Sequence, residues 1–180
     1  SDIQRQTLAA HGDKIAWHES FADVPNGFLL IAANELFDAI PIRQFVKTQQ
    51  GFRERVVNLD ADDELIFMPG VAGIDPDLLP PLPERQPPGT IYEYSPAREA
   101  VMTAISERLK ASSGTALIID YGHTVSGYGD TLQAIRMHEF DPVLAHPGEA
   151  DLTSHVDFES LTRTAQASGI HVNGCLYQGD

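Results

Sequence analysis

The sequence has 180 residues, of which 42% are hydrophobic, so one domain with a single packed core is expected rather than a disordered chain. Acidic residues outnumber basic residues 26 to 12. The formal charge of -14 therefore argues against a nucleic-acid or anionic-membrane surface, which needs clustered lysine and arginine. The charge suits a cationic partner, or it serves only to keep the protein in solution.

The first part of the chain predicts a helix followed by two strands. Residues 1–11 have the apolar spacing of a helix that Gly12 ends. Residues 15–17 predict a short strand, and residues 23–27 have the composition of a turn. Residues 28–33, FLLIAA, form a continuous apolar run, which is typical of a parallel strand buried on both faces.

The next segment predicts an antiparallel β-meander inserted between these elements and the second half of the chain. Residues 42–48, 52–59 and 65–68 read as its strands, so the insertion spans residues 42–68. Residues 69–90 hold seven of the 12 prolines, and we expect an irregular crossing loop there.

A helix and a second buried strand are predicted next. Ser95 supplies a helix cap and Pro96 the first helical position. The helix carries an apolar stripe and is ended by Gly114. The residues of the stripe are Val101, Ile105 and Leu109. Residues 116–119, ALII, then predict a buried strand.

The remainder of the chain is polar and rich in glycine as far as residue 156. Asp157 can cap a last helix, which Gly169 ends, and residues 170–176 predict a final strand. Cys175, the only cysteine, lies in the apolar-flanked run Gly174-Cys175-Leu176, so we expect a buried thiol without catalytic use. A single cysteine also excludes an internal disulfide and favours a reducing compartment.

Buried strands that alternate with amphipathic helices predict an α/β fold with a largely parallel sheet, in one domain over residues 1–180. Ligands of such sheets bind beyond the carboxyl ends of the strands. Three predicted strands end in polar residues, and we expect all three ends to face one crevice. These ends are residues 17–19, 34–35 and 120–122.

Several common sites are disfavoured by their motifs. Residues 122–129 carry glycines after a strand, but they lack the third glycine and the following helix of a dinucleotide loop. The spacing of His138, His146 and His155 matches no standard zinc pattern, and no metal site is predicted. The Gly-x-Ser-x-Gly motif of serine hydrolases is absent from the sequence. The sequence contains no run of about 18 apolar residues, so no membrane span is predicted, and no signal peptide is visible.

Four runs together resemble the MidA family, in the family's order. They are ANELFDAIPIRQFV (33–46), ALIIDYGH (116–123), GDTLQAIRMH (129–138) and PGEADLTSHVDF (147–158). The resemblance covers essentially the whole chain. It implies a class I methyltransferase (Rossmann-like) fold, S-adenosyl-L-methionine as methyl donor, and methylation of a protein arginine, on a subunit of respiratory complex I, in support of complex I assembly.

The implied reaction gives the polar strand ends their expected roles. A guanidinium keeps its charge, with a pKa above about 12, so carboxylates suit its binding and orientation. We expect Glu35 and Asp38 to hold the arginine, with Glu35 as the first choice. His155 and Asp157, which match the family's HVDF run, are expected in the same catalytic pocket; the alternative is that Asp157 only caps the helix with His155 packed beside it.

The remaining predicted site residues serve the substrate or the cofactor. Asp120, Tyr121 and His123 are expected to border the arginine. Asn34 is expected at the methionine end of the cofactor, and Trp17 and His18 at its adenine. For Trp17, an ordinary core position is the alternative.

The resemblance also implies that this chain is an internal piece of a longer protein. The family's glycine-rich cofactor loop is expected roughly 20 to 40 residues before Ser1, and the family continues beyond residue 180. This fragment alone is then expected to bind the cofactor weakly and to be inactive. A non-catalytic assembly factor that grips a basic client segment is the alternative function, and bacterial cytoplasm and mitochondrial matrix are both open as locations. The oligomeric state is not predicted.

Overall fold

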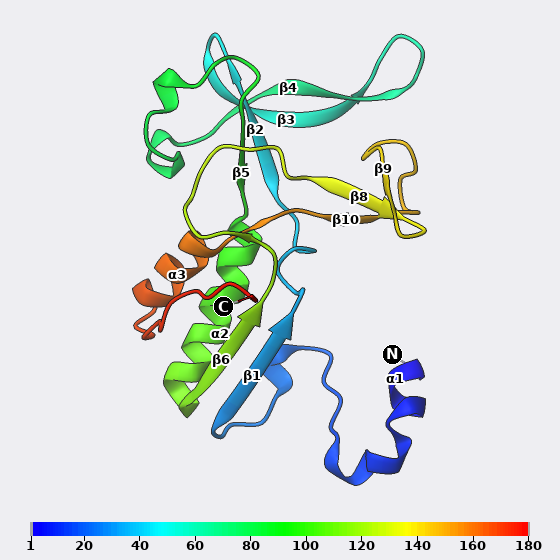
Figure 1. Ribbon diagram of the computed structural model, residues 1–180, viewed down its shortest axis with the longest axis vertical. Helices are drawn as coiled ribbons and strands as arrows, with labels where there is room; N and C mark the ends of the chain where they lie inside the picture. The colour runs from blue at the N-terminus through cyan, green and yellow to red at the C-terminus, as the bar shows by residue number, and fades with distance from the viewer. Residues whose placement is uncertain (1, 180) are drawn as a thin grey trace.

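The computed structural model describes residues 2–179 and has a mixed α/β architecture (Figure 1). Its helices are α1 (Asp2–Thr7), α2 (Pro96–Ser112) and α3 (Phe158–Ala167), with short 3-10 helices η1 (Ala9–Lys14), η2 (Phe21–Asp23), η3 (Pro76–Leu78) and η4 (Pro83–Arg85). Its strands are β1 (Leu29–Asn34), β2 (Arg43–Thr48), β3 (Gly51–Leu59), β4 (Leu65–Gly73), β5 (Ile91–Tyr94), β6 (Gly114–Ile119), β7 (Gly122–His123), β8 (Gln133–Arg136), β9 (Glu139–Asp141), β10 (Asp151–Thr153) and β11 (Val156–Asp157).

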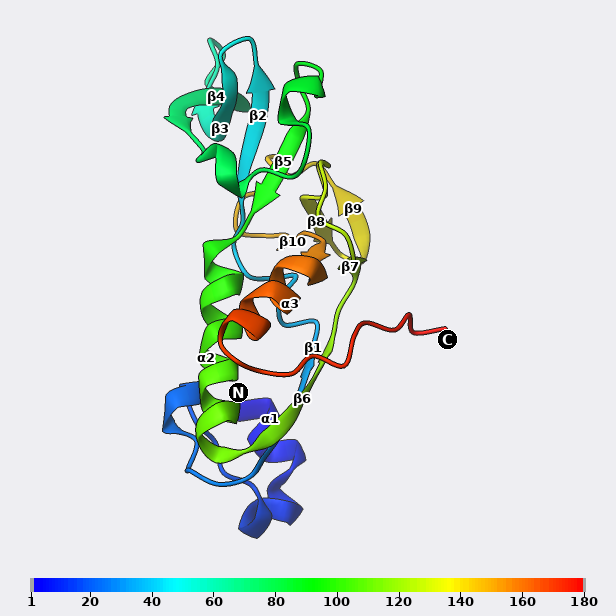
Figure 2. The same cartoon turned by 90° about the vertical axis from the view of Figure 1, so that its left-hand side faces the viewer.

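The parallel pair β1 and β6 forms the centre of the lower half of the molecule. The strands pair in register from Leu29 opposite Gly114 to Asn34 opposite Ile119. One face packs on α2 and α3, which lie together on the same side of the pair in Figures 1 and 2. The opposite face is exposed and apolar, and it carries Phe28, Leu30, Leu117 and Ile119.

Helix α2 begins where the sequence predicts, because Ser95 accepts a hydrogen bond from the Arg98 amide and Pro96 occupies the first helical position. Its buried stripe joins α3 and both strands in one core. The fully buried apolar members of the α2 stripe are Met102, Ile105 and Leu109. Val101, which was expected in the stripe, is only partly buried.

The β-meander forms a second sheet with its own small core. The strand order is β4-β3-β2-β5, all antiparallel. Phe45, Phe52 and Tyr92 are buried in it, and the ring of Tyr128 stacks on Phe52 at 5.6 Å. Figure 1 shows the β3–β4 hairpin projecting well beyond the rest of this sheet. Strand β4 continues through Pro69 to Gly73, so the first residues of the segment 69–90, which was expected to be an irregular loop, contribute to this sheet. Strand β5, which the sequence did not predict, joins it on the other side.

The polar segment 120–157 contains five short strands that the sequence analysis did not predict. Strands β10-β8-β9 form an antiparallel sheet, and β7 pairs with β11 in parallel. The β7–β11 pairing requires glycine at residue 122, because a Cβ there would overlap the carbonyl oxygen of Val156.

Four predictions at the ends of the chain are wrong. Residues 15–17 and 170–176 form no strand, and neither segment pairs with any described strand, so the strand-like composition of each is not supported by a backbone partner. The N-terminal helix ends at Thr7 rather than near Gly12. Cys175 is exposed rather than buried. The part of the chain that the structure describes contains no helix long and apolar enough to cross a membrane.

Candidate functional site

Two of the three polar strand ends lie together at the carboxyl end of the parallel pair, as predicted. Asn34 lies opposite Ile119, so Glu35 and Asp120 follow at the same edge. The Glu35 amide continues the ladder with a 2.8 Å hydrogen bond to the Ile119 carbonyl. Residues 17–19 follow no strand, and their part in this convergence is wrong.

Asp120 anchors the turn that follows β1. Its Oδ2 accepts hydrogen bonds from the amides of Phe37 (3.0 Å) and Asp38 (3.2 Å), and its Oδ1 accepts from the Tyr121 amide (3.0 Å). Burial raises the pKa of Asp120, with the nearby Asp38 charge acting in the same direction, while the three amide bonds oppose the shift. This carboxylate is therefore engaged in shaping the turn, and its predicted contact with substrate stays a prediction.

Asp38 is the carboxylate of this turn that retains an unused acceptor. The residue is only 5% exposed, and its Oδ2 accepts a 2.7 Å hydrogen bond from the Tyr121 hydroxyl. Its Oδ1 is buried without any hydrogen-bond partner among the described residues. A buried acceptor without a donor is costly, so this oxygen is suited to a donor that a ligand brings.

Glu35 differs from Asp38 in every respect that matters for binding. Its side chain is exposed and makes no hydrogen bond within the described part of the chain, and its backbone adopts a positive φ of 48°. Non-glycine residues in that conformation are uncommon and are often found at functional turns. Glu35 is therefore available to a ligand but not pre-oriented.

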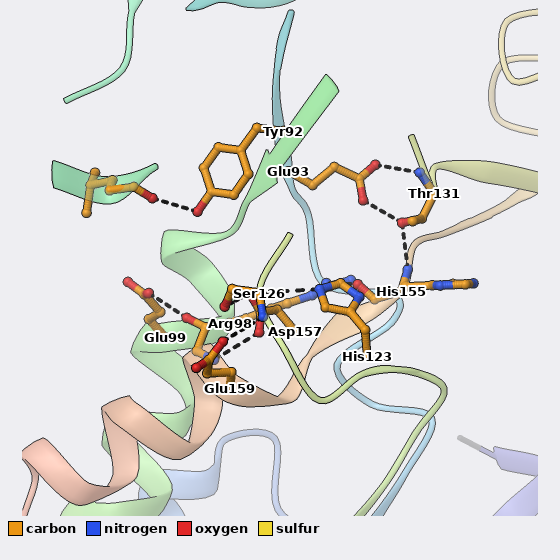
Figure 3. Close-up of polar contacts among 12 residues, drawn as sticks. Tyr92, Glu93, Arg98, Glu99, His123, Ser126, Thr131, His155, Asp157 and Glu159 are labelled. Atoms are coloured by element: carbon orange, nitrogen blue, oxygen red, sulfur yellow. Dashed lines mark hydrogen bonds and ion pairs between the residues drawn. The ribbon is translucent and has the colours of Figure 1, made fainter. Parts of the chain in front are cut away.

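His155 and Asp157 line the wall beside Tyr121. The rings of His155 and Tyr121 meet edge to face at 5.8 Å. Asp157 caps α3 by accepting from the Ser160 amide at 3.0 Å, which confirms the cap; its predicted place in the catalytic pocket stays a prediction. Figure 3 shows its second oxygen accepting from the Ser126 hydroxyl at 2.6 Å, and His123 Nε2 lies 3.9 Å away from the same oxygen.

Two residues of this region were missed by the sequence analysis. Arg98, at the first turn of α2, is buried and binds the backbone on both sides of the site. A charged residue four positions before Met102, on the apolar stripe, was the signal that could have revealed it. Glu93 of β5 accepts from Thr131, whose hydroxyl also accepts from the His155 amide at 2.9 Å (Figure 3); no sequence pattern pointed to it.

A small cavity with a volume of about 30 Å³ lies beside His155 and Asp157. Its lining includes Glu93, Arg98, His123, His155 and Asp157. That volume suits one or two waters, whereas cofactor pockets measure about 300–1,000 Å³. The cavity is therefore not a cofactor pocket.

The predicted cofactor residues are not gathered in the described structure. The guanidinium carbon of Arg5 lies over the indole of Trp17, 5.3 Å from the centre of the Trp17 ring. No described contact joins Trp17 or His18 to Asn34. A larger hollow of about 560 Å³ lies at the far end of the meander, away from every predicted site residue, and it is lined by Thr48, Gln49, Gln50, Arg53, Pro69, Gly70 and Val71. The exposed amide of Asn34 offers hydrogen bonds to a cofactor's end, but the described residues do not enclose a whole cofactor. The cofactor roles of Asn34, Trp17 and His18 stay predictions.

No three histidine, cysteine, aspartate or glutamate side chains gather to hold a metal within residues 2–179. His146 instead pairs with Asp141, at 2.6 Å between Nδ1 and Oδ2.

Comparison with known sequences identifies relatives over most of the chain. A family profile described as "Putative S-adenosyl-L-methionine-dependent methyltransferase" matches residues 1–176. The mitochondrial protein arginine methyltransferase NDUFAF7 of Mus musculus is 36% identical over 166 residues, covering 91% of this chain and 37% of the relative. The human protein of the same name is 34% identical over 170 residues, covering 92% and 37%. The chain thus spans well under half the length of these curated relatives.

Two solved structures from Burkholderia thailandensis share the fold. The first, an uncharacterized protein of the COG1565 superfamily, has a TM-score of 0.72 at 22% identity, covering 92% of this chain and 46% of that protein. A second, bound to S-adenosyl-homocysteine, has a TM-score of 0.71 at 23% identity, covering 92% and 45%. These similarities confirm the predicted class of fold.

Proposed function

The chain belongs to this family of S-adenosyl-L-methionine-dependent methyltransferases, and from that premise we propose that its protein methylates an arginine side chain of another protein. The proposed site is the turn after β1, with Asp38 and Tyr121 at its centre and Glu35 and His155 at its rim. The names of the curated relatives, protein arginine methyltransferases, support this substrate class.

The free, buried Oδ1 of Asp38 is the observation that carries the proposal. A guanidinium offers five N–H donors in a fixed plane and stays charged, so an ionised carboxylate both attracts it and fixes its orientation. Oδ2 is already held by the Tyr121 hydroxyl, which leaves the buried Oδ1 as the carboxylate oxygen without a donor among the described residues. This geometry favours Asp38 over Glu35 as the residue that holds the arginine.

Methyl transfer from a sulfonium needs alignment more than acid–base chemistry, because the donor supplies an already activated methyl group when bound. The task of this chain's residues is to present one guanidinium nitrogen and to stabilise its charge. Asp38 holds the guanidinium, Glu35 screens it at the rim, and Asp120 keeps the turn in shape through three backbone amides.

The proposal is tested on the complete protein by quantifying methylarginine after incubation with labelled S-adenosyl-L-methionine and a Gly-Gly-Arg-Gly-Gly peptide. Asp38→Asn should lower the rate about 100-fold, by analogy with the loss of one pre-organised charge-stabilising group. Asp77→Asn, at an exposed carboxylate of η3, is the matched control. Titration of S-adenosyl-homocysteine by calorimetry should give the same affinity for both variants.

Full transfer by a correctly folded Asp38→Asn variant would refute the assigned role of this carboxylate. Absence of S-adenosyl-homocysteine binding by the complete protein would instead favour the alternative of a non-catalytic assembly factor. As the natural substrate we propose a subunit of respiratory complex I, on the basis of the family resemblance, and the mitochondrial matrix or the bacterial cytoplasm as the location. The mitochondrial names of the relatives support the first of these locations.

A further inference from the structure

Arg98 is a buried cation that meets backbone carbonyls instead of a carboxylate. The residue is 6% exposed, and it forms no ion pair within the described part of the chain. Burial lowers the pKa of its guanidinium, while the charges of Glu93, Asp120 and Asp38 act against that shift. An arginine that is not used for an ion pair must have another reason to be placed in the core.

Its N–H groups connect two segments that are more than 100 residues apart in the sequence. On one side, Nε donates to the carbonyl of Phe37 (2.7 Å) and Nη2 to that of Asp38 (3.1 Å). On the other side, Nη1 donates to the carbonyl of His155 (2.6 Å), and Nη2 to the carbonyl (3.0 Å) and hydroxyl (2.7 Å) of Ser154. Figure 3 shows the guanidinium lying between the His155 segment and α2.

The direct backbone contact between the two segments is slight by comparison. The Ser154 amide donates to the Asp38 carbonyl at 3.1 Å, the same carbonyl that Arg98 Nη2 contacts. The planar guanidinium fixes the direction of each donor, whereas an ammonium group is a compact charge with rotatable donors. The separation of the two segments therefore depends on the shape of Arg98 as well as on its charge.

We propose that Arg98 is the positioning residue of this site, because it sets the distance between the turn that carries Asp38 and the segment that carries His155. It does not touch the substrate; it acts through Asp38 and His155. Its consequence for substrate binding rests on the proposed function, but the connection between the two segments does not.

Arg108 provides a matched control on the same helix. Its Nη2 donates to the carbonyls of Val24 and Pro25, so it also joins α2 to a loop through backbone acceptors. That loop lies before β1 and carries no site residue. Arg98→Lys and Arg108→Lys each keep the positive charge and lose the planar guanidinium. The main difference between them is which segment the side chain joins to α2. Arg98→Gln, which is neutral but still a donor, is a second variant in case the lysine variant folds poorly.

The first measurement is amide hydrogen exchange, which needs no enzymatic activity. Arg98→Lys should speed exchange about tenfold at the amides of Phe37, Asp38 and Ser154, which bridge or border the two segments. Exchange in the β2–β3 ladder should be unchanged. Arg108→Lys should leave all three amides as in the wild type.

The second measurement separates positioning from a loss of folded protein. A smaller folded fraction lowers kcat but leaves KM unchanged, whereas a displaced Asp38 weakens binding of the arginine. Arg98→Lys should therefore raise KM for the Gly-Gly-Arg-Gly-Gly peptide about tenfold, and Arg108→Lys should not.

The proposal would be overturned if both Arg98→Lys and Arg98→Gln left exchange at the three amides unchanged, or if both accelerated exchange equally throughout the chain. A fall in kcat at constant KM would also overturn it. If the wild-type protein transfers no methyl group, the proposed function fails while the exchange result still decides the role of Arg98.

Discussion

At the scale of single residues, Asp38 and Asp120 of the site differ in how their carboxylate oxygens are hydrogen-bonded. Asp120 has both oxygens bound to backbone amides, while Asp38 keeps one oxygen free. The sequence predicted that acids would gather at this strand end, because polar residues directly follow two buried strands. It could not predict which carboxylate is free, since that depends on which amides the folded turn presents. For the same reason the sequence favoured Glu35, whereas the folded turn favours Asp38.

Asp120 provides a test by titration. Its pKa is raised by burial, so the folded protein binds this proton more tightly than the unfolded chain. Its contribution to stability is therefore fully present below the model-compound pKa of 3.8 and is lost as pH rises through the folded-state value. Carbon NMR of the Asp120 carboxyl should show a midpoint above 3.8, and a midpoint below that value would contradict the assignment.

At the scale of elements, long apolar runs were informative and short strands were not. The cores of β1 and β6 were predicted within one or two residues because each is an uninterrupted apolar run flanked by turn or polar residues. Strands β8 to β11 have two to four residues each, and their pairing is decided by tertiary partners. Residues 170–176, IHVNGCL, alternate apolar and polar side chains at first but form no strand among the described residues, which shows that such a short pattern alone does not make a strand.

The β7–β11 pair gives a prediction at this scale. Gly122→Ala should destabilise the protein by several kcal/mol, on the order of 3 kcal/mol, because the new methyl group overlaps the Val156 carbonyl and must separate the two strands. Gly127→Ala is the control, since nothing lies within 4 Å of its added carbon. Urea unfolding measures both. Equal stability of the two variants would mean that β7 and β11 do not approach as closely as described.

At the scale of the whole molecule, the acidic composition matches the proposed cationic substrate. The net charge of -14 attracts an arginine-bearing segment over a range set by the ionic strength. Composition alone argued against a nucleic-acid partner and left a cationic partner open. It could not identify arginine, which came from the family resemblance and from the placement of the carboxylates.

This attraction predicts a dependence on salt. The affinity for an arginine-rich peptide, measured by fluorescence anisotropy, should fall about tenfold between 50 mM and 500 mM sodium chloride, amounts chosen to shorten the screening length from about 14 Å to about 4 Å. Binding of S-adenosyl-homocysteine by the complete protein, a ligand without net charge, should change little. Peptide affinity that is insensitive to salt would rule out a role for the overall charge.

The central claim is that the free oxygen of Asp38 receives the guanidinium of an arginine. It is tested most directly by following the side-chain carboxyl carbon of Asp38 by NMR while N-ethylguanidinium is added. A saturable shift is expected at Asp38, with the Asp77 signal unmoved, and Asp38→Asn should abolish the binding. Saturation of the protein with N-ethylguanidinium while the Asp38 signal stays fixed would contradict it.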